Sequence, residues 1–146
     1  RRACARIDEE RLAIRIRQTD SHEVINMKLV LVSDDASISD NFRQAVGGQG
    51  HQVNAVRGEY PLENGGLPEC DAVLVEEKTW IRHASLYRYF DVLPEFMGCP
   101  FGVIGKRKPT RIKARRRNAD TWISAGFSPA EALEAVAVLG RAAALS

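Results

Sequence analysis

Residues 28–35 read Lys-Leu-Val-Leu-Val-Ser-Asp-Asp, and residues 71–76 read Asp-Ala-Val-Leu-Val-Glu. Each stretch is a short aliphatic run that ends abruptly in acidic side chains. A continuous apolar run of this length, with no polar residue alternating through it, is typical of a strand buried on both faces of a parallel sheet. The two stretches therefore predict a sheet that is covered by helices on both sides.

The rest of the chain repeats this pattern of strand followed by helix, which favours right-handed βαβ units. In such folds the chemistry lies at the carboxyl ends of the strands. Further strands are predicted at residues 51–56, 101–104 and 121–123, helices at 37–46, 80–96 and from 128 onward, and a short basic helix or turn at 110–117.

Three of these helical segments carry more specific signals. In the segment 80–96, helical spacing places Leu86, Tyr89, Phe90 and Leu93 on one face, which we expect to be buried. The crossover over residues 57–70 is broken by prolines and glycines and predicts no full-length helix. The last helix opens with Ser128, Pro129 and Glu131, the pattern of a capping box.

Composition bounds the class of protein. The 146 residues are 45% hydrophobic and 27% charged, as expected for one ordinary globular domain. With 21 basic and 19 acidic residues, the overall charge is too balanced to imply a nucleic-acid partner. No apolar run approaches the ~18 residues of a membrane span. Three cysteines without CxxC spacing, and the lack of an apolar leader, fit a cytoplasmic protein with free thiols.

The first 26 residues differ from the rest and form a basic stretch. We interpret them as an N-terminal extension, a linker or the end of a preceding domain, and an added strand or helix stays open. Arg2 and Arg6 have the spacing of cyclic-dinucleotide-binding PilZ domains, but the second motif of those domains does not follow. Because the chain begins with Arg1 rather than Met, we expect it to be a fragment of a longer protein.

The strand ends and the last helix resemble the receiver domain of bacterial response regulators. Residues 28–35 are similar to the receiver's first strand and acidic pair, and residues 71–76 to the strand that ends in the phosphorylated Asp. Residues 119–123 and 127–133 are similar to the fifth strand and last helix, and this is the most specific part of the match.

The resemblance covers about residues 27–145 and implies an α/β, flavodoxin-like (βα)5 fold. Such a fold is a doubly wound parallel sheet with strand order 2-1-3-4-5, in which helix 2 would be degenerate here. Residues 27–146 would form the receiver-like domain. Cys70 and Cys99 precede neighbouring strands, so their thiols should lie close together at the end of the sheet away from the acidic residues.

Receiver chemistry needs an acceptor Asp, a magnesium ion held by acidic oxygens, a hydroxyl after the fourth strand and a Lys after the fifth. The one extra methylene of a Glu moves the acceptor carboxylate by about 1.5 Å, enough to spoil in-line attack. The acceptor position holds Glu76, the hydroxyl position holds Gly105 and the lysine position holds Ala125, so three of the four functions are missing. The resemblance therefore implies a pseudo-receiver that is not an enzyme and needs no cofactor. The positions of the degenerate site hold Ser33, Asp34 and the adjacent Asp35, then Glu76, Gly105 and Ala125.

Several interpretations of these residues stay open. Glu76 is either an ordinary solvated carboxylate at a strand end or a permanent mimic of the phosphorylated state. Asp34 and Glu76 could bind magnesium weakly, and Asp35 or Lys106 could replace part of what is lost. The three histidines, His22, His51 and His83, have no Cys or carboxylate at ligand spacing and are expected to be structural or on the surface.

The strongest local charge is a basic run over residues 106–117, eight basic residues in twelve. In the receiver resemblance this run, the fifth strand and the last helix form the usual output and dimer face. We expect a solvated face, or a surface for an acidic protein or an adjacent domain of the same chain, or for a homodimer; nucleic acid is disfavoured because no aromatic residues interleave. The residues of this face are Lys106, Arg107, Lys108, Arg111, Lys113, Arg115, Arg116, Arg117 and Trp122.

These features predict a phosphorylation-independent signalling module that acts by protein–protein contact. Two alternatives are a phosphoacceptor receiver with an atypical site and a small-ligand-binding flavodoxin-like domain.

Charge reversal of the basic run tests the predicted surface. We expect the triple variant R115E/R116E/R117E to lose self-association or partner binding at low salt while staying folded, since exposed charges usually change stability by less than about 0.5 kcal/mol. Added salt should shrink the difference, because exposed charges are screened beyond about 8 Å at physiological ionic strength. Sedimentation or pull-down at low salt measures the association. If the variant behaves like the wild type, the basic run is only a solvated face.

Overall fold

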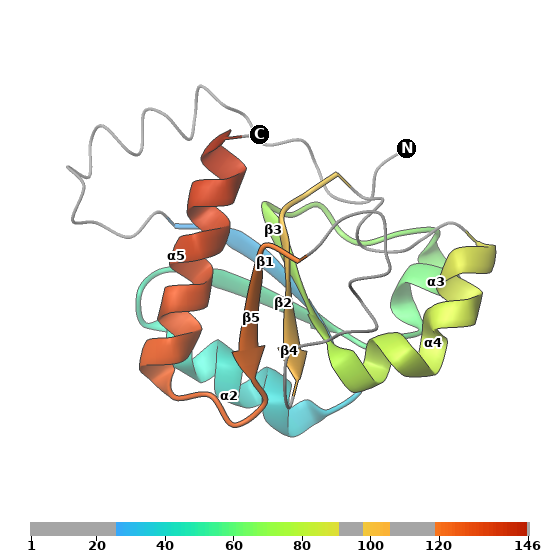
Figure 1. Cartoon of the computed structure of the whole chain (residues 1–146), viewed down its shortest axis with the longest axis horizontal. Coiled ribbons are helices and arrows are strands. Elements are labelled where there is room, and N and C mark those ends of the chain that lie inside the picture. Colours follow the sequence, from blue (N-terminus) through green and yellow to red (C-terminus); the bar gives the residue numbers. More distant parts are fainter. Residues whose placement is uncertain (1–25, 91–97, 106–118, 146) are drawn as a thin grey trace.

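A computed structural model describes residues 26–90, 98–105 and 119–145 of the chain (Figure 1). The predicted N-terminal extension, apart from Asn26, lies outside the described residues. The basic run over 106–117 and the helix or turn predicted at 110–117 lie outside them as well. None of the helices in the described ranges is long and apolar enough to cross a membrane.

The centre of the fold is one five-stranded sheet in which every neighbouring pair of strands is parallel. Its spatial order is β2-β1-β3-β4-β5, which confirms the flavodoxin-like fold class and the strand order 2-1-3-4-5. Each predicted strand is present, with bounds shifted by at most one residue. The strands are β1 (Lys28–Val32), β2 (Gln52–Val56), β3 (Ala72–Glu76), β4 (Phe101–Gly105) and β5 (Thr121–Ser124).

Four described helices cover the two faces of the sheet (Figure 1). Helices α2 (Ala36–Gly47) and α5 (Pro129–Leu145) lie on one face and contact each other. Helices α3 (Tyr60–Asn64) and α4 (Glu77–Tyr89) lie on the opposite face. Helix α3 has only five residues and ends at Gly65 in the left-handed region, so the degenerate second helix of the repeat is confirmed.

Two apolar layers fill the space between sheet and helices, because alternate side chains of each strand point to opposite faces. Along β1, Leu29 and Leu31 pack under α2 and α5, whereas Val30 and Val32 pack toward α4 with Trp80. Strands β1, β3 and β4 are buried along almost their whole length. This double burial explains why their sequences are continuous apolar runs.

The position and buried face of α4 differ from the sequence prediction. The helix begins at Glu77, directly after β3, rather than at residue 80, and the described helix ends at Tyr89. Its buried side chains are Thr79, Trp80, His83 and Tyr87, one stripe at helical spacing. The predicted buried face is wrong, because Leu86, Tyr89 and Phe90 are exposed and the bulky Trp80 sets the side that meets the sheet. Leu93 lies outside the described residues.

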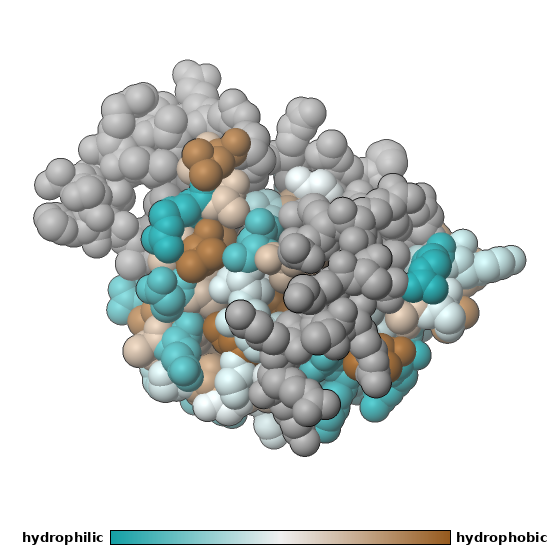
Figure 2. Space-filling view, in the orientation of Figure 1, coloured by the Kyte–Doolittle hydropathy of each residue, from teal (hydrophilic) through white to brown (hydrophobic). Residues whose placement is uncertain are grey.

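The predicted cap of α5 is confirmed. The Ser128 hydroxyl accepts the Glu131 N–H at 3.1 Å, and the Glu131 carboxylate accepts the Ser128 N–H at 2.8 Å. This reciprocal pair satisfies two N–H groups that the helix start leaves without an intrahelical partner. On the outside of the helix, Figure 2 shows polar side chains mixed with scattered apolar ones, and Leu145 is exposed at its end.

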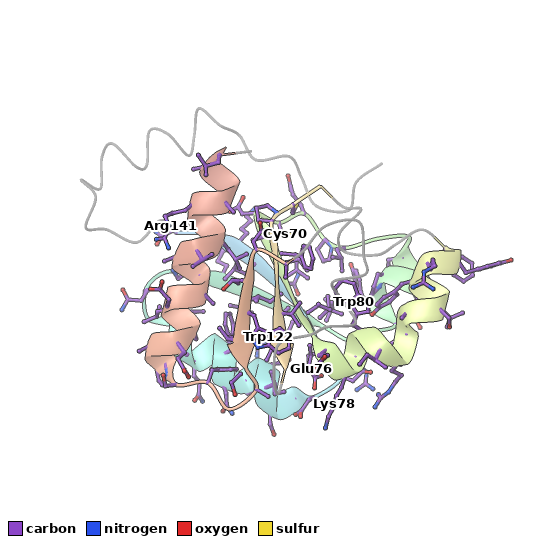
Figure 3. All side chains as sticks on the ribbon, in the orientation of Figure 1. Cys70, Glu76, Lys78, Trp80, Trp122 and Arg141 are labelled. Carbon is purple, nitrogen blue, oxygen red and sulfur yellow. The ribbon has the colours of Figure 1, made fainter. Side chains whose placement is uncertain are left out.

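Cys70 and Cys99 are buried near each other, as predicted. The Cys99 thiol lies 3.8 Å from the Cys70 carbonyl oxygen, at the start of neighbouring strands β3 and β4. Figure 3 shows Cys70 and Glu76 at opposite ends of the sheet. The thiols are therefore remote from Glu76, and their chemical state stays a prediction.

His51 predicts a pH dependence of stability. Its Nδ1 accepts the Met27 N–H at 3.2 Å, and burial lowers its pKa below 6.5. The unfolded chain therefore binds a proton that the native state excludes, so stability is lost as the pH falls through the unfolded value. Between about pH 7.5 and 5.5, this histidine should cost up to about 1 kcal/mol of unfolding free energy.

Urea denaturation at the two pH values measures this loss, with H51N as the matched variant. The Asn amide oxygen can still accept the Met27 N–H but does not titrate. The loss on acidification should be smaller in H51N; an equal loss in both proteins would show that other groups cause it.

Candidate functional site

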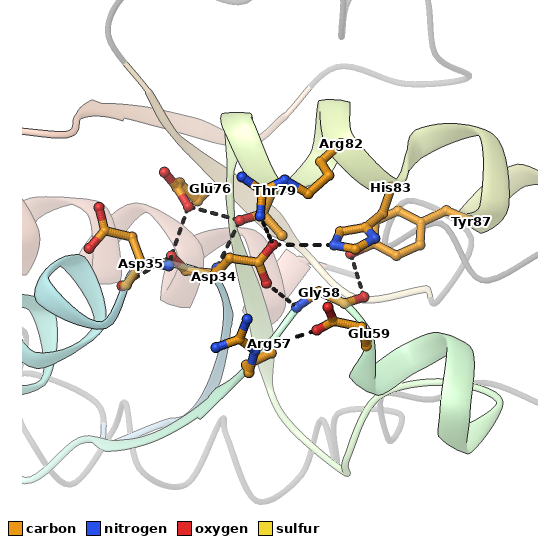
Figure 4. Close-up of polar contacts among 11 residues, drawn as sticks. Asp34, Asp35, Arg57, Gly58, Glu59, Glu76, Thr79, Arg82, His83 and Tyr87 are labelled. Carbon is orange, nitrogen blue, oxygen red and sulfur yellow. Dashed lines mark hydrogen bonds and ion pairs between the residues drawn. The ribbon is translucent and has the colours of Figure 1, made fainter.

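The polar side chains singled out at the strand ends gather at the carboxyl edge of the sheet. Ser33 and Asp34 follow β1, Glu76 ends β3 and Gly105 ends β4. In a parallel sheet these ends share one edge, which helices cannot cover completely. Side chains from the loop after β2 and from α4 complete the group (Figure 4).

Glu76 is held by two hydroxyls and is almost fully buried. Its Oε1 accepts hydrogen bonds from Ser33 Oγ at 2.9 Å and from Thr79 Oγ1 at 2.8 Å. Only 5% of Glu76 is exposed, so the interpretation as an ordinary solvated carboxylate is wrong. The two hydroxyl donors offset the cost of burying the carboxylate. The carboxylate that the sequence resemblance aligns with the receiver's phosphoacceptor is therefore already bonded to its own neighbours.

Asp34 faces a different set of partners. Its Oδ1 accepts the Gly58 N–H at 2.8 Å, while Oδ2 lies 2.7 Å from Arg82 Nη1 and 3.2 Å from His83 Nε2. Burial alone raises the pKa of the Asp34 carboxyl, but the bonds from Gly58 and His83 and the charges of His83 and Arg82 outweigh it and leave the pKa lowered. Asp34 thus joins β1, the loop after β2, and α4.

Asp35 is used as a helix cap. Its Oδ1 accepts the N–H groups of Ser37 at 2.9 Å and Ile38 at 3.4 Å, at the start of α2. Its own N–H is bonded to Ser33 Oγ at 3.0 Å. The carboxylate that could replace the missing acid of the pair is therefore bonded to the helix start.

The hydroxyl and lysine positions of the receiver pattern lie in packed surroundings. Gly105 is buried, and a Cβ atom added there would collide with the Trp122 ring and lie 2.6 Å from Glu77 Oε1. Ala125 is half-buried against the layer under α2 and α5, and its N–H donates to the Gly105 carbonyl at 2.9 Å. Lys106, the suggested substitute cation, lies outside the described residues.

The residues present do not fit a magnesium ion held as in a receiver. Asp34 and Glu76 direct their carboxylates to different partners (Figure 4), and the second member of the acidic pair is Ser33. Weak magnesium binding by Asp34 and Glu76 stays a prediction. A different group could hold a metal ion: ligand atoms of Asp34, Glu59 and His83 all lie within 4.8 Å of one another.

The histidine prediction holds for His51 and is incomplete for His83. His51 is buried and bonded to the backbone, whereas His22 lies outside the described residues. His83 has no carboxylate at ligand spacing along the sequence, but in the fold it contacts Asp34, which is 49 positions earlier in the chain. Spacing along the sequence cannot reveal a contact that the fold makes between β1 and α4.

Sequence reasoning also missed Thr79 and Tyr87, which share the inner stripe of α4 with His83. The Tyr87 hydroxyl donates to the Gly58 carbonyl at 3.0 Å, and its ring stacks on His83 with centroids 5.7 Å apart. Burial, and then the carboxylates of Asp34 and Glu59, raise the pKa of this hydroxyl far above its usual range. The four-residue spacing of positions 79, 83 and 87 places them on one helical face. The predicted helix began at residue 80, so Thr79 was not recognised as part of that face.

Of the predicted partner-binding face, the structure describes only Trp122. Its side chain is half-buried between the end of β4 and the layer that contains Trp80. All the basic members of that face lie outside the described residues.

Solved structures show what this arrangement resembles. The sequence matches no protein-family model, and no curated protein matches it. The signal receiver domain of NarL from Mycobacterium tuberculosis is 14% identical, with a TM-score of 0.54 over 80% of this chain and 97% of that one. A CheY-like response regulator receiver domain from Methylobacillus flagellatus is 16% identical, with a TM-score of 0.55 over 77% of this chain and 99% of that one.

NtrX from Brucella abortus, in complex with ATP, gives a TM-score of 0.61 at 13% identity over 83% of this chain. The match covers 28% of NtrX, a much longer protein. The fold is thus that of a response-regulator receiver, and at these identities the likeness concerns the fold alone.

Restoring the receiver hydroxyl should disrupt packing. We expect G105S to lower the free energy of unfolding by about 1–3 kcal/mol, since the new side chain meets Trp122 and Glu77 in a filled space. G126S is the matched control, because the nearest atom to a Cβ there is Ser124 Oγ at 3.9 Å. Chemical denaturation of the two variants compares them, and equal stabilities would mean that the end of β4 has room for a hydroxyl.

Proposed function

We propose that this domain is a receiver-like regulatory module that acts by protein–protein contact, without phosphotransfer and without catalysis of its own. The observation that carries the proposal is Glu76, whose carboxylate stands at the acceptor position and is bonded to Ser33 and Thr79. A carboxylate acceptor must approach phosphorus in line, with its charge partners in place. Here the acceptor is longer by one methylene and buried.

The surrounding positions support the same proposal. A receiver's hydroxyl and lysine would bind phosphoryl oxygens, but Gly105 and Ala125 offer neither a hydroxyl nor a cation. The packing of Trp122 against Gly105 also opposes the inward movement of an aromatic side chain that accompanies phosphorylation in receivers. The output surface would therefore keep one arrangement, and regulation would come from the availability of a partner or from an adjacent domain.

The partner is proposed to be an acidic protein surface, an adjacent domain of the same chain or a second copy of the domain. The basic run over 106–117, with Trp122 beside it in the sequence, supports this choice by its charge. No aromatic residue interleaves with the basic residues of that run, which disfavours nucleic acid. A cytoplasmic location is part of the proposal, because three cysteines without a disulfide framework suit a reducing compartment.

Phosphorylation by a small donor tests the proposal directly. Intact-mass measurement after incubation with acetyl phosphate and magnesium should show no gain of a phosphoryl group. The E76Q variant, which keeps the shape of the side chain, is treated in parallel. A phosphorylated species in the wild-type protein that E76Q lacks would identify an atypical phosphoacceptor and refute the proposal. A small molecule that co-purifies and binds saturably would favour the ligand-binding alternative instead.

A further inference from the structure

Three side chains from separate elements converge beside the degenerate site. Asp34 follows β1, Glu59 immediately precedes α3, and His83 lies on the inner stripe of α4. Their ligand atoms, two carboxylate oxygens and one imidazole nitrogen, lie within 4.8 Å of one another. This group shares only Asp34 with the positions from which receivers draw magnesium ligands.

The backbone at Gly58 is shaped to bring these side chains together. A Cβ atom at Gly58 would collide with the His83 ring and lie 2.8 Å from Thr79 Cγ2, so the close approach of the imidazole requires glycine there. The Gly58 N–H holds Asp34 Oδ1 at 2.8 Å, and its carbonyl accepts the Tyr87 hydroxyl at 3.0 Å. One carboxylate oxygen and the imidazole ring are therefore fixed before any ligand arrives (Figure 4).

The exposure of the three residues gives an ion a way in. Asp34 and His83 are nearly buried, with about a tenth of each side chain exposed, whereas 46% of the Glu59 side chain is exposed. Glu59 is paired only loosely with Arg57, at 3.5 Å, in an ion pair open to water. It can therefore turn toward an ion at little cost, because exposed pairs of this kind contribute little free energy.

The geometry points to a binding site for a divalent transition-metal ion of the zinc class, held by Asp34, Glu59 and His83. One imidazole and two carboxylates favour zinc over magnesium, which prefers oxygen ligands alone. Two ligands about 2.1 Å from a tetrahedral zinc lie roughly 3.4 Å apart, so the observed group needs only a small contraction. Two carboxylate charges balance the charge of the ion, and water would complete its coordination.

Arg82 competes with the ion for Asp34. Its Nη1 lies 2.7 Å from Oδ2, the oxygen that also faces His83, but the Arg82 side chain is 62% exposed. The metal would replace this arginine, which can move out into solvent. A purely structural Asp34–Arg82 pair would give no saturable metal binding, so the two interpretations differ in what a titration shows.

Calorimetric titration of the full chain with zinc chloride, after treatment with chelator and in the presence of a phosphine reductant, tests the site. We expect one saturable site that E59Q weakens by at least about tenfold, since even outer-shell changes at metal sites cost this much. H83Q should weaken it similarly. E63Q, a neutralised carboxylate one turn further along α3, is the matched control and should bind like the wild type.

R82Q supplies a test in the opposite direction. Removing the competing cation should tighten zinc binding by about two- to fivefold, the value of an exposed ion pair. The melting temperature should rise with zinc in the wild type and in E63Q, but not in E59Q. Absence of saturable binding, or equal affinity in wild type and E59Q, would overturn the inference; the second result would place the ion elsewhere in the chain. If H83Q fails to fold, E59Q decides, because the Glu59 side chain is 46% exposed and its ion pair is with the exposed Arg57.

Discussion

The burial of the sheet on both faces is the constraint on which the other features depend. Strands β3 and β4 are buried at every residue, so their backbone groups need hydrogen-bond partners within the protein, and most of these are on neighbouring strands. Polar side chains are then restricted to the strand ends, and parallel pairing brings those ends to one edge. The positions of Asp34 and Glu76 follow from this topology, whatever chemistry the edge performs.

The sequence was sufficient for the three central strands because each is a short apolar run that ends at polar or glycine residues, within a regular alternation of strands and helices. It was insufficient for α4, where Trp80 and the exposed Leu86 carry the same apolar signal but face opposite environments. The periodicity of apolar residues identifies the faces of a helix but does not show which face packs against the sheet. The face that meets the sheet is the one that carries the large side chain of Trp80. A count of apolar positions does not measure how well such a side chain packs.

The candidate site was also predicted only in part: the positions of its residues were found, but their contacts were not. Alignment with the receiver pattern located Ser33, Asp34 and Glu76 at one edge, since each ends a predicted strand. It could not show the partners of Asp34, because Thr79 and His83 lie on a helix 45 and 49 positions later in the chain. The burial of Glu76 was not predicted either, because the pattern of a strand does not show the Ser33 and Thr79 hydroxyls that bond to its carboxylate.

Thr79 joins the two halves of this edge into one hydrogen-bonded network. Its hydroxyl donates to Glu76 at 2.8 Å and accepts the Asp34 N–H at 2.9 Å. Because the hydroxyl has a single proton, the directions of both hydrogen bonds are fixed. Asp34 in turn bonds to Gly58, Arg82 and His83. Any ligand that binds the Asp34 carboxylate acts on a residue whose backbone is linked, through Thr79, to the Glu76 carboxylate. The Thr79 hydroxyl thus connects the Asp34 backbone to the Glu76 carboxylate through two hydrogen bonds, so the positions of these two acidic residues depend on each other.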